Sequence, residues 1–503
     1  YVGHAETGIA SFRPLALGKA TVDSCVLRLA QTPEGEMNIK QVVDRMRGKG
    51  EGNFRLFINH AEVTDFSFIL SRRDREPRSE GIDFANLRIY DADIDGRDLS
   101  IVGDSIALRV DAMSFRERSG FRLDDMSADP LSVVGGKLRF DNLHLASGAT
   151  DLNIPQLALE GASWDDFSEF VDRVPMTLRA DNSSLDLATV GYFAPSLAGK
   201  NILLSGFDLD VSGPVSAMKG ALSHARVGAR GDVDMTFSIS GLPDIYRTRF
   251  DMDLRRFSID AADLRTLLPE LTGKPLDDKT TEMIGRARTL NASGQFNGLL
   301  SAFDASVLLK THQGAVNGRF SLHYAEANGR RFNGMVTTRG FNCGELLGND
   351  KLGRITMTAF MTGHAAKGKL TANVDGRIPH LYFNGYHYDS VRLNGRFDNR
   401  RFEGYAGCAD NNLDFDFNGS VDFNDEVPRY DFDLELKRAD LHALNFNRRD
   451  TVSILSASVV ARSSGRSIDD MNGTVDVNGV RYISPEDTVS VGGISLIGEN
   501  TAG

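Results

Sequence analysis

Apolar and polar residues alternate along much of the chain with a period of two. This alternation is typical of a half-buried β-strand, because a pleated strand sends successive side chains to opposite faces. The clearest apolar sets are Val233, Met235, Phe237 and Ile239; Leu413, Phe415 and Phe417; and Phe432, Leu434 and Leu436. Polar residues, many of them aspartates, fill the positions between. The pattern predicts a mainly β protein whose repeated strands each have one apolar and one polar face.

Asn-Gly pairs mark the C-terminal two-fifths of the chain. An Asn-Gly pair suits a two-residue hairpin loop, where both residues take a positive φ. We therefore expect an antiparallel meander whose hairpins turn at these pairs. The asparagines are Asn297, Asn317, Asn328, Asn333, Asn384, Asn394, Asn418, Asn472 and Asn478.

Three short helices are expected among the strands. One runs from Ile39 to Met46 after the N-cap residue Asn38. A second follows Ser163 and Asp166, which have the spacing of a capping box. A third passes through Leu264, Leu267 and Leu268 and should end at Pro269, because proline disrupts a helix interior.

At 503 residues, the chain is longer than one compact core usually supports. Composition suggests weak boundaries near Gly161 and Gly273. We therefore expect three regions: an N-terminal β region with one short helix (1–160), a β continuation with short helices (161–272), and hairpin-rich repeats (273–503).

Hydrophobic residues make up 41% of the chain and charged residues 25%, the range of folded globular proteins. The net charge is -12 and no run of Lys and Arg is dense enough to track a phosphate backbone, which argues against a nucleic-acid partner. No stretch has the roughly 18 apolar residues of a spanning helix. Cys25, Cys343 and Cys408 have neither disulfide-framework nor zinc-site spacing, so we expect three small buried thiols.

No motif nominates a catalytic residue. The run from Gly363 to Lys369 has the letters of a phosphate loop, but Leu370 replaces the required Ser or Thr and a strand follows. Asp91, Asp93 and Asp95 begin like a calcium loop, yet they alternate with apolar residues and Val102 stands where the bidentate Glu belongs.

The remaining enzyme signatures are also missing from the sequence. There is no GxSxG elbow and no HExxH pair, and no third ligand accompanies His380 and His387. We therefore expect no enzyme, no metal and no cofactor. A carboxylate pair for glycoside hydrolysis stays open, because aspartates are abundant and none is singled out.

Several phrases, in their order along the chain, resemble a known family. LRLAQTPEGEMNIKQVV, from Leu27 onward, resembles the start of AsmA-like envelope proteins. Three N-terminal phrases are similar to TamB-type proteins of the Bacteroidetes group: GIDFANLRIYDADIDG, SFRERSGFRLDDMSAD and ISGLPDIYRTRFDMDLRRFSIDAADLRTLLPEL. YFAPSLAG adds to them, as do GMVTTRGFNCGELLG, IPHLYFNGYHYDSVRLNGRF and LDFDFNGSVDF nearer the C-terminus.

The resemblance implies a long, curved antiparallel sheet, folded like a taco around an apolar groove. It implies a periplasmic bridge that conducts phospholipid between the inner and outer membranes and takes part in outer-membrane biogenesis and protein assembly. It also implies an N-terminal inner-membrane anchor and a C-terminal family domain, neither of which is recognised in this chain. A partner barrel of the Omp85 type would bind through a segment outside it.

On this reading, the apolar sets named first are the candidate lipid-groove residues, and phospholipid acyl chains are their ligand. Two other classes stay open. One is a β-repeat adhesin or scaffold with a dry sandwich core, since alternation is equally expected when a second sheet covers the apolar face. The other is a polysaccharide-active β-helix enzyme.

Overall fold

The computed structural model describes residues 15–32, 35, 37, 38, 55–73, 76–103, 105–325, 329–366 and 369–499. The chain divides into two compact units. Unit 1 comprises Tyr1–Phe250 with Thr266–Pro275, and unit 2 comprises Asp251–Arg265 with Leu276–Gly503.

In its described residues, unit 1 contains twelve complete strands and short helical segments between some of them. The strands are β1 (Leu15–Asp23), β2 (Val26–Ala30), β3 (Arg55–Ser71), β4 (Arg88–Val102), β5 (Ser105–Glu117), β6 (Arg122–Val134), β7 (Lys137–Ser147), β8 (Thr150–Glu160), β9 (Met176–Asp186), β10 (Leu203–Gly213), β11 (Ala217–Val227) and β12 (Gly231–Ser240). The helical segments are η1 (Trp164–Glu169), α2 (Phe170–Arg173), α3 (Leu187–Gly191) and η2 (Pro195–Leu197).

Unit 2, as far as the structure describes it, is a simpler succession of strands with two helices. Its strands are β14 (Thr289–Leu299), β15 (Ala302–Thr311), β16 (Gly314–Ala325), β17 (Gly329–Asn342), β18 (Leu352–Ala366), β19 (Lys369–Phe383), β20 (Tyr386–Asp398), β21 (Arg401–Ala409), β22 (Leu413–Asp422), β23 (Arg429–Asp440), β24 (Ile454–Ser464), β25 (Asn472–Ile483) and β26 (Thr488–Gly498). Its helices are α5 (Asp278–Ala287) and α6 (Cys343–Leu347). β13 (Arg249–Asp260) and α4 (Ala261–Thr272) hold residues of both units.

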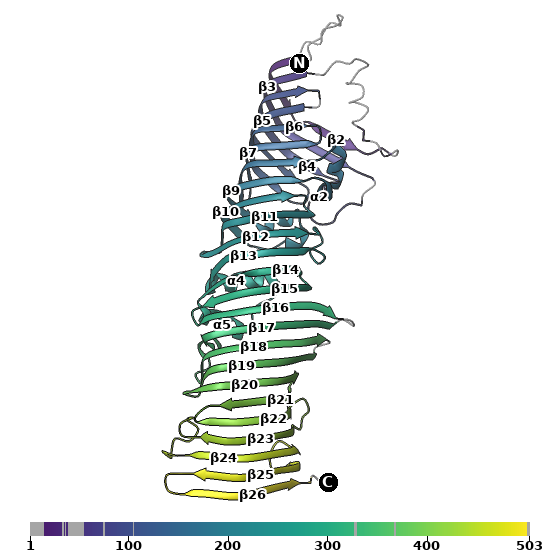
Figure 1. Ribbon diagram of the computed structural model, residues 1–503. Helices are drawn as coiled ribbons and strands as arrows, with labels where there is room; N and C mark the ends of the chain where they lie inside the picture. Colours follow the sequence, from purple (N-terminus) through teal and green to yellow (C-terminus); the bar gives the residue numbers. More distant parts are fainter. Residues whose placement is uncertain are drawn as a thin grey trace, which may run out of the picture. The chain divides into compact units, whose positions relative to one another are not determined.

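The described strands form one sheet of 26 strands that does not close on itself. Within unit 2 each strand from β15 to β26 pairs antiparallel with the strand before it, and Figure 1 shows this succession. In unit 1 the order is also sequential and antiparallel from β3 to β12, whereas β1 and β2 pair parallel with β3. The prediction of a mainly β, repetitive antiparallel sheet is confirmed.

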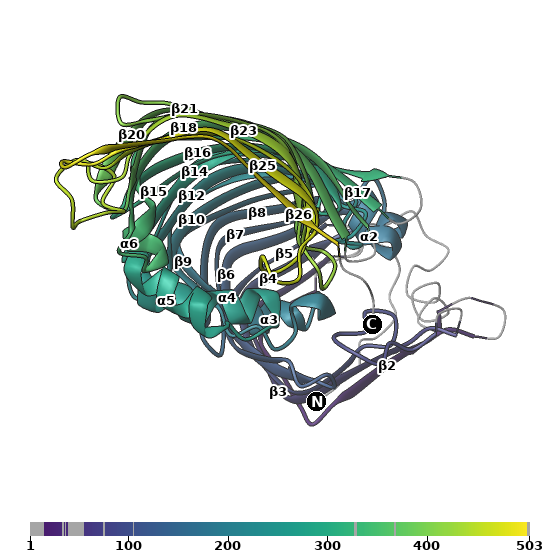
Figure 2. The ribbon, with the colours of Figure 1, turned by 90° about the horizontal axis from the view of Figure 1, so that it is seen from below.

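The strands of unit 2 are bent, and Figure 2 shows them as curved ribbons with α5 and α6 beside their ends. α6 packs on β18 and contacts α5.

The Asn-Gly turn prediction is right once among the described pairs and otherwise wrong. Asn384 and Gly385 form the two-residue loop between β19 and β20, with φ of 50° and 81°. Asn472 begins β25, and Asn328 lies outside the described residues. The other asparagines lie inside strands: Asn297, Asn317, Asn333, Asn394, Asn418 and Asn478.

A packing requirement explains most of these internal glycines. The glycines that follow Asn317, Asn333 and Asn394 leave no room for a β-carbon, which would collide with a phenylalanine ring. At Gly395, for example, it would lie 2.6 Å from the ring of Phe402. The glycines that follow Asn297 and Asn418 have a positive φ, and a β-carbon there would collide with a carbonyl oxygen of the next strand or turn. Glycine therefore marks close packing within a strand here, and not a turn.

The helix predictions have three different outcomes. The helix after Asn38 falls outside the described residues. The capping box of Ser163 and Asp166 is present and begins η1, which α2 follows directly, so this prediction is confirmed. α4 continues past Pro269 to Thr272, so the predicted end at the proline is wrong.

The prediction of three buried thiols is also wrong in part. Cys408 is buried, Cys343 is half-buried and Cys25 is exposed. Cys25 lies in the short interruption between β1 and β2, which both run parallel to β3. Burial raises the pKa of Cys408 to about 11, so this thiol stays protonated and unreactive at neutral pH.

Candidate functional site

The pairing register of unit 2 places one residue of each strand in a lateral row that crosses the sheet. The row through Phe432 contains only apolar residues and glycine, and we call it the central row. From β14 to β26 it consists of Phe296, Ala305, Phe320, Gly334, Met361, Val374, Gly395, Gly404, Gly419, Phe432, Ala461, Val475 and Leu496.

A second row lies on the same face, displaced by two residues from the central row on each strand. This flanking row also contains no polar side chain. It consists of Gly294, Val307, Gly318, Val336, Ala359, Gly376, Leu393, Ala406, Phe417, Leu434, Val459, Val477 and Ile494.

The flanking row on the other side of the central row has no charge and includes only two polar groups, the hydroxyls of Tyr430 and Ser463. Its members are Gly298, Phe303, Leu322, Phe332, Gly363, Ala372, Phe397, Phe402, Val421, Tyr430, Ser463, Gly473 and Gly498. We call these three rows together the apolar face of unit 2. With roughly 6.7 Å between alternate residues of a strand, it is about 13 Å wide.

Aromatic rings connect four neighbouring strands on this face. The ring centroids of Phe397 and Phe402 are 5.0 Å apart, those of Phe402 and Phe417 are 6.1 Å apart, and those of Phe417 and Phe432 are 5.1 Å apart. These separations are typical of stabilising aromatic pairs. Gly395 of the central row leaves room for one of them, since a β-carbon there would lie 2.6 Å from the ring of Phe402.

Unit 1 has an apolar face of the same kind, but more deeply packed. One row crosses it from β5 to β12 without a polar residue: Leu108, Leu131, Phe140, Leu157, Leu178, Val211, Gly220 and Phe237. Beside it lies a cluster of fully buried side chains: Val110, Ala128, Leu143, Ile154, Ala180, Phe207 and Ala225.

The lipid-groove candidates predicted from the sequence are all half-buried. Phe417, Phe432 and Leu434 lie in the three rows of unit 2, and Phe237 lies in the row of unit 1. Val233 packs against the buried cluster of unit 1, and Met235 pairs laterally with Leu222 of that face. Leu413, Phe415 and Leu436 pack against a second cluster around Cys408 and Leu444. A facing sheet would bury such side chains almost completely, so their half-burial fits a single layer.

The opposite face of the sheet is charged. The ammonium of Lys437 is 2.6 Å from a carboxylate oxygen of Asp416. The guanidinium of Arg462 lies between Asp431 and Asp433, with 2.9 Å to each carboxylate. Alternation therefore separates an uncharged face from an ion-paired one, as the sequence predicted.

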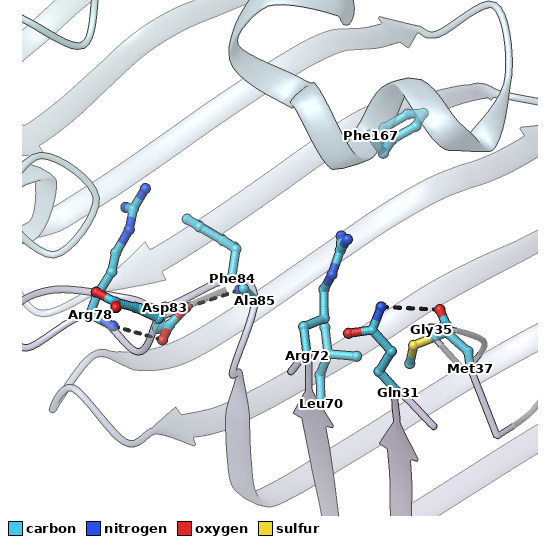
Figure 3. A pocket seen from close by; sticks show the side chains of 11 residues that line it. Gln31, Gly35, Met37, Leu70, Arg72, Arg78, Asp83, Phe84, Ala85 and Phe167 are labelled. Carbon is cyan, nitrogen blue, oxygen red and sulfur yellow. Dashed lines mark hydrogen bonds between the residues drawn. The ribbon is translucent and has the colours of Figure 1, made fainter. Parts of the chain in front are cut away.

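A cavity of about 770 Å³ lies in unit 1 and was not anticipated from the sequence. Figure 3 shows the guanidinium groups of Arg72 and Arg78 extending into it, with Phe167 of η1 on the opposite side. Leu70 and Phe84 form part of the wall. Its signal in the sequence is the group of arginines between residues 72 and 78, which matches no phosphate or metal motif.

Asp83 organises the loop that carries Arg78 and Phe84. Its buried carboxylate accepts hydrogen bonds from the backbone N–H groups of Arg78, Ala85 and Asn86, at 3.0–3.1 Å, and from the Asn86 side chain. Burial raises the pKa of Asp83, but these hydrogen bonds outweigh burial, so its pKa lies below the ordinary value. The carboxylate therefore stays ionised and holds the loop in place.

The residues that imitated catalytic or metal motifs are dispersed. Asp91, Asp93 and Asp95 lie along β4, and Asp95 accepts a hydrogen bond from His60 at 2.8 Å. His380 contacts Asp389 at 2.7 Å, whereas the ring of His387 packs on Tyr382. Within the described residues, no three His, Cys, Asp or Glu side chains come together in a group able to hold a metal ion.

The comparisons with known proteins give no relative. No family model matches the chain, and neither a curated protein nor a solved structure matches it. In the part of the chain that the structure describes, no helix is both long enough and apolar enough to span a membrane.

Proposed function

We propose that the chain conducts phospholipid acyl chains along its apolar faces, as part of a periplasmic bridge between the inner and outer membranes that serves outer-membrane biogenesis. The observation that carries this proposal is the set of lateral rows in unit 2, which cross strand after strand without a charge. The family resemblance supports the compartment, the inner-membrane anchor of the full-length protein and the role in outer-membrane protein assembly.

The energetics favour such a path. An acyl chain in water exposes methylene groups at roughly 0.8 kcal/mol each, so sixteen of them cost about 13 kcal/mol. A continuous apolar surface removes much of this cost at every position along the path. At roughly 4.8 Å per strand, the rows from β14 to β26 offer such a surface over on the order of 60 Å.

The path needs no catalytic residue, because each step exchanges one set of apolar contacts for an equivalent one. The polar headgroup stays in water beside the apolar face. Half-buried phenylalanines such as Phe417 and Phe432 retain uncovered ring surface, which an acyl chain would cover.

The test compares two variants of β22, each with one added carboxylate, on opposite faces of the sheet. Phe417→Asp puts a carboxylate in the apolar face, while Asn418→Asp puts the same charge on the adjacent, exposed residue of the opposite face. We expect Phe417→Asp to reduce the lipid that co-purifies with the chain, measured by mass spectrometry, and to slow transfer of a fluorescent phospholipid between vesicles. Asn418→Asp should behave as the native chain does.

A second pair repeats the test in unit 1. Phe237→Asp should reduce lipid transfer, and Ser238→Asp should not. Circular dichroism checks that each variant keeps its strands. Normal lipid transfer by folded Phe417→Asp and Phe237→Asp would contradict the proposal and would favour a scaffold whose apolar face serves only the fold.

A further inference from the structure

Two neighbouring hollows lie on the opposite face of unit 2, away from its apolar rows. The first, of about 510 Å³, lies over β14 to β18, and the second, of about 370 Å³, lies over β18 to β21. Phe360 of β18 lines both hollows and is 48% exposed. At roughly 4.8 Å per strand, the two hollows together extend over about 34 Å of the sheet, which suits an extended ligand.

The pairing register places a defined set of side chains around the ring of Phe360. Met335 is its direct neighbour on β17. Two residues further along β18, Thr362 lies between Asn333 of β17 and Asn373 of β19. The β-carbons of direct neighbours are about 5 Å apart and those of diagonal neighbours roughly 7 Å apart. Both amides are therefore within reach of a ligand that packs on the ring.

The two amides are available to such a ligand. Asn333 and Asn373 are exposed, and within the described residues neither side chain has a hydrogen-bond partner. Lys437 and Arg462, by contrast, form ion pairs on the same face. An amide side chain both donates and accepts hydrogen bonds, so it suits a ligand that carries amides and hydroxyls of its own.

The charges that line the two hollows nearly cancel. Among the described residues, Arg319 and Asp304 line the first hollow, and Arg396, Asp375 and Glu403 line the second. A surface with this balance attracts neither an anionic nor a cationic chain by its net charge. The hollows therefore fit an uncharged ligand.

We propose that this surface binds an extended β-linked glycan of N-acetylhexosamines. One sugar ring packs on Phe360, and its acetamido and hydroxyl groups hydrogen-bond to Asn333 and Asn373. A pyranose has apolar C–H groups on its faces and polar groups at its edge, which matches an exposed ring surrounded by amides. The sugar repeat of such a glycan is close to the distance between strands, so successive sugars meet successive strands. This binding goes beyond lipid conduction and uses the other face of the sheet.

Two hexasaccharides test the ligand class in calorimetric titrations of the whole chain. Chitohexaose carries an acetamido group on every sugar, whereas cellohexaose has the same linkage and only hydroxyls. We expect chitohexaose to bind the native chain and cellohexaose to bind about fivefold more weakly, because hydrogen bonds between amides are lost.

Variants then locate the binding. Phe360→Ala should weaken chitohexaose binding by about tenfold, since the stacking surface is lost. The matched control is Phe446→Ala, which removes a 61% exposed ring from the connection between β23 and β24 and should leave binding unchanged. Asn333→Ala with Asn373→Ala should weaken chitohexaose binding and abolish its preference over cellohexaose. Circular dichroism checks that each variant keeps its strands.

Three results would overturn the proposal. They are no chitohexaose binding by the native chain, equal affinity in Phe360→Ala, or equal affinities of the two hexasaccharides for the native chain. Phe417→Asp should leave glycan binding intact while it reduces lipid transfer, and Phe360→Ala should leave lipid transfer intact. Failure of the glycan proposal and failure of the conduction proposal are therefore distinguishable.

Discussion

The two units build an apolar face from the same alternation by different means. Unit 1 interrupts its strands with bulges, where Asp65, Asp98, Asn182 and His224 take a positive φ, and it packs a buried cluster of which Phe207 is the largest member. Asp and Asn adopt a positive φ more readily than most other residues with side chains, which explains why they occur at these bulges.

Unit 2 also has bulges, but they lie outside its three rows, and within the rows it combines glycine with phenylalanine. The central row has Gly404 and Gly419 next to Phe432, and the rings of Phe402, Phe417 and Phe432 are tilted against one another. The pairing between β20 and β22 has no register shift. The same alternation of apolar and polar residues therefore produces a deeply packed face in unit 1 and an incompletely covered face in unit 2. The two faces differ in the sizes of the side chains along their rows, which in unit 2 include many glycines.

The largest expected effect tests this difference in packing. Phe207→Ala removes a ring that is 1% exposed and should cost unit 1 about 3–5 kcal/mol of unfolding free energy. Phe417→Ala removes a half-buried ring and should cost unit 2 roughly 1–3 kcal/mol. Hydrogen exchange in urea, followed on peptides from each unit, measures both. Phe207→Leu is the conservative control, and equal losses at the two sites would contradict the comparison.

A smaller effect tests the glycine rows of unit 2. Gly419 has a φ of 140°, and an added β-carbon would lie 2.3 Å from the Asp431 carbonyl oxygen. Gly419→Ala should therefore destabilise unit 2 by about 1–3 kcal/mol in urea unfolding. The control is Gly492→Ala, where a β-carbon meets nothing within 4 Å, and its expected change is within about 0.5 kcal/mol. Similar changes in both variants would show that the rows need no glycine.

The smallest effect concerns two aspartates whose pKa values lie below the ordinary value. The backbone N–H of Asn182 and then the ring of His224 lower the pKa of Asp208 in unit 1. The ammonium of Lys437 and then the hydroxyl of Tyr405 lower that of Asp416 in unit 2. Each contributes stability that is present above the unfolded pKa of about 3.9 and is lost as the pH falls through the folded pKa.

Added salt should change the pKa values of these two aspartates by different amounts. Both side chains are more than a third exposed, so each contribution is under about 1 kcal/mol. At about 1 M salt the pKa of Asp416 should rise further than that of Asp208, because an ion pair is screened and a backbone hydrogen bond is not. Carbon-detected NMR titration at low and high salt measures both values, and equal responses would contradict the assigned causes.

The sequence predicted which face of the sheet each side chain occupies, but not which residues of neighbouring strands pack against each other. Alternation placed Phe237, Phe417 and Leu434 on the apolar face, because the period of two follows from the pleat alone. The Asn-Gly pairs predicted the turn at Asn384 correctly and most of the others wrongly. Such a pair looks the same in the sequence whether its glycine permits a turn or, like Gly395, makes room for a ring on the next strand. Only the register distinguishes these uses.

The unit 1 cavity lay beyond sequence reasoning for a related reason. Its walls come from β3, the following loop and η1, so Leu70, Phe84 and Phe167 are brought together by the fold and not by spacing. The capping box at Ser163 predicted η1 correctly, yet nothing local indicated that Phe167 would face two arginines.

The most direct test of lipid conduction is photo-crosslinking at adjacent residues of β22. A photoreactive amino acid replaces Phe417 in one variant and Asn418 in another, and lipid attached after illumination in cells is identified by mass spectrometry. Because the two side chains lie on opposite faces, the account predicts crosslinked phospholipid from position 417 and none from position 418. The absence of lipid at position 417, or equal crosslinking at both positions, would contradict it.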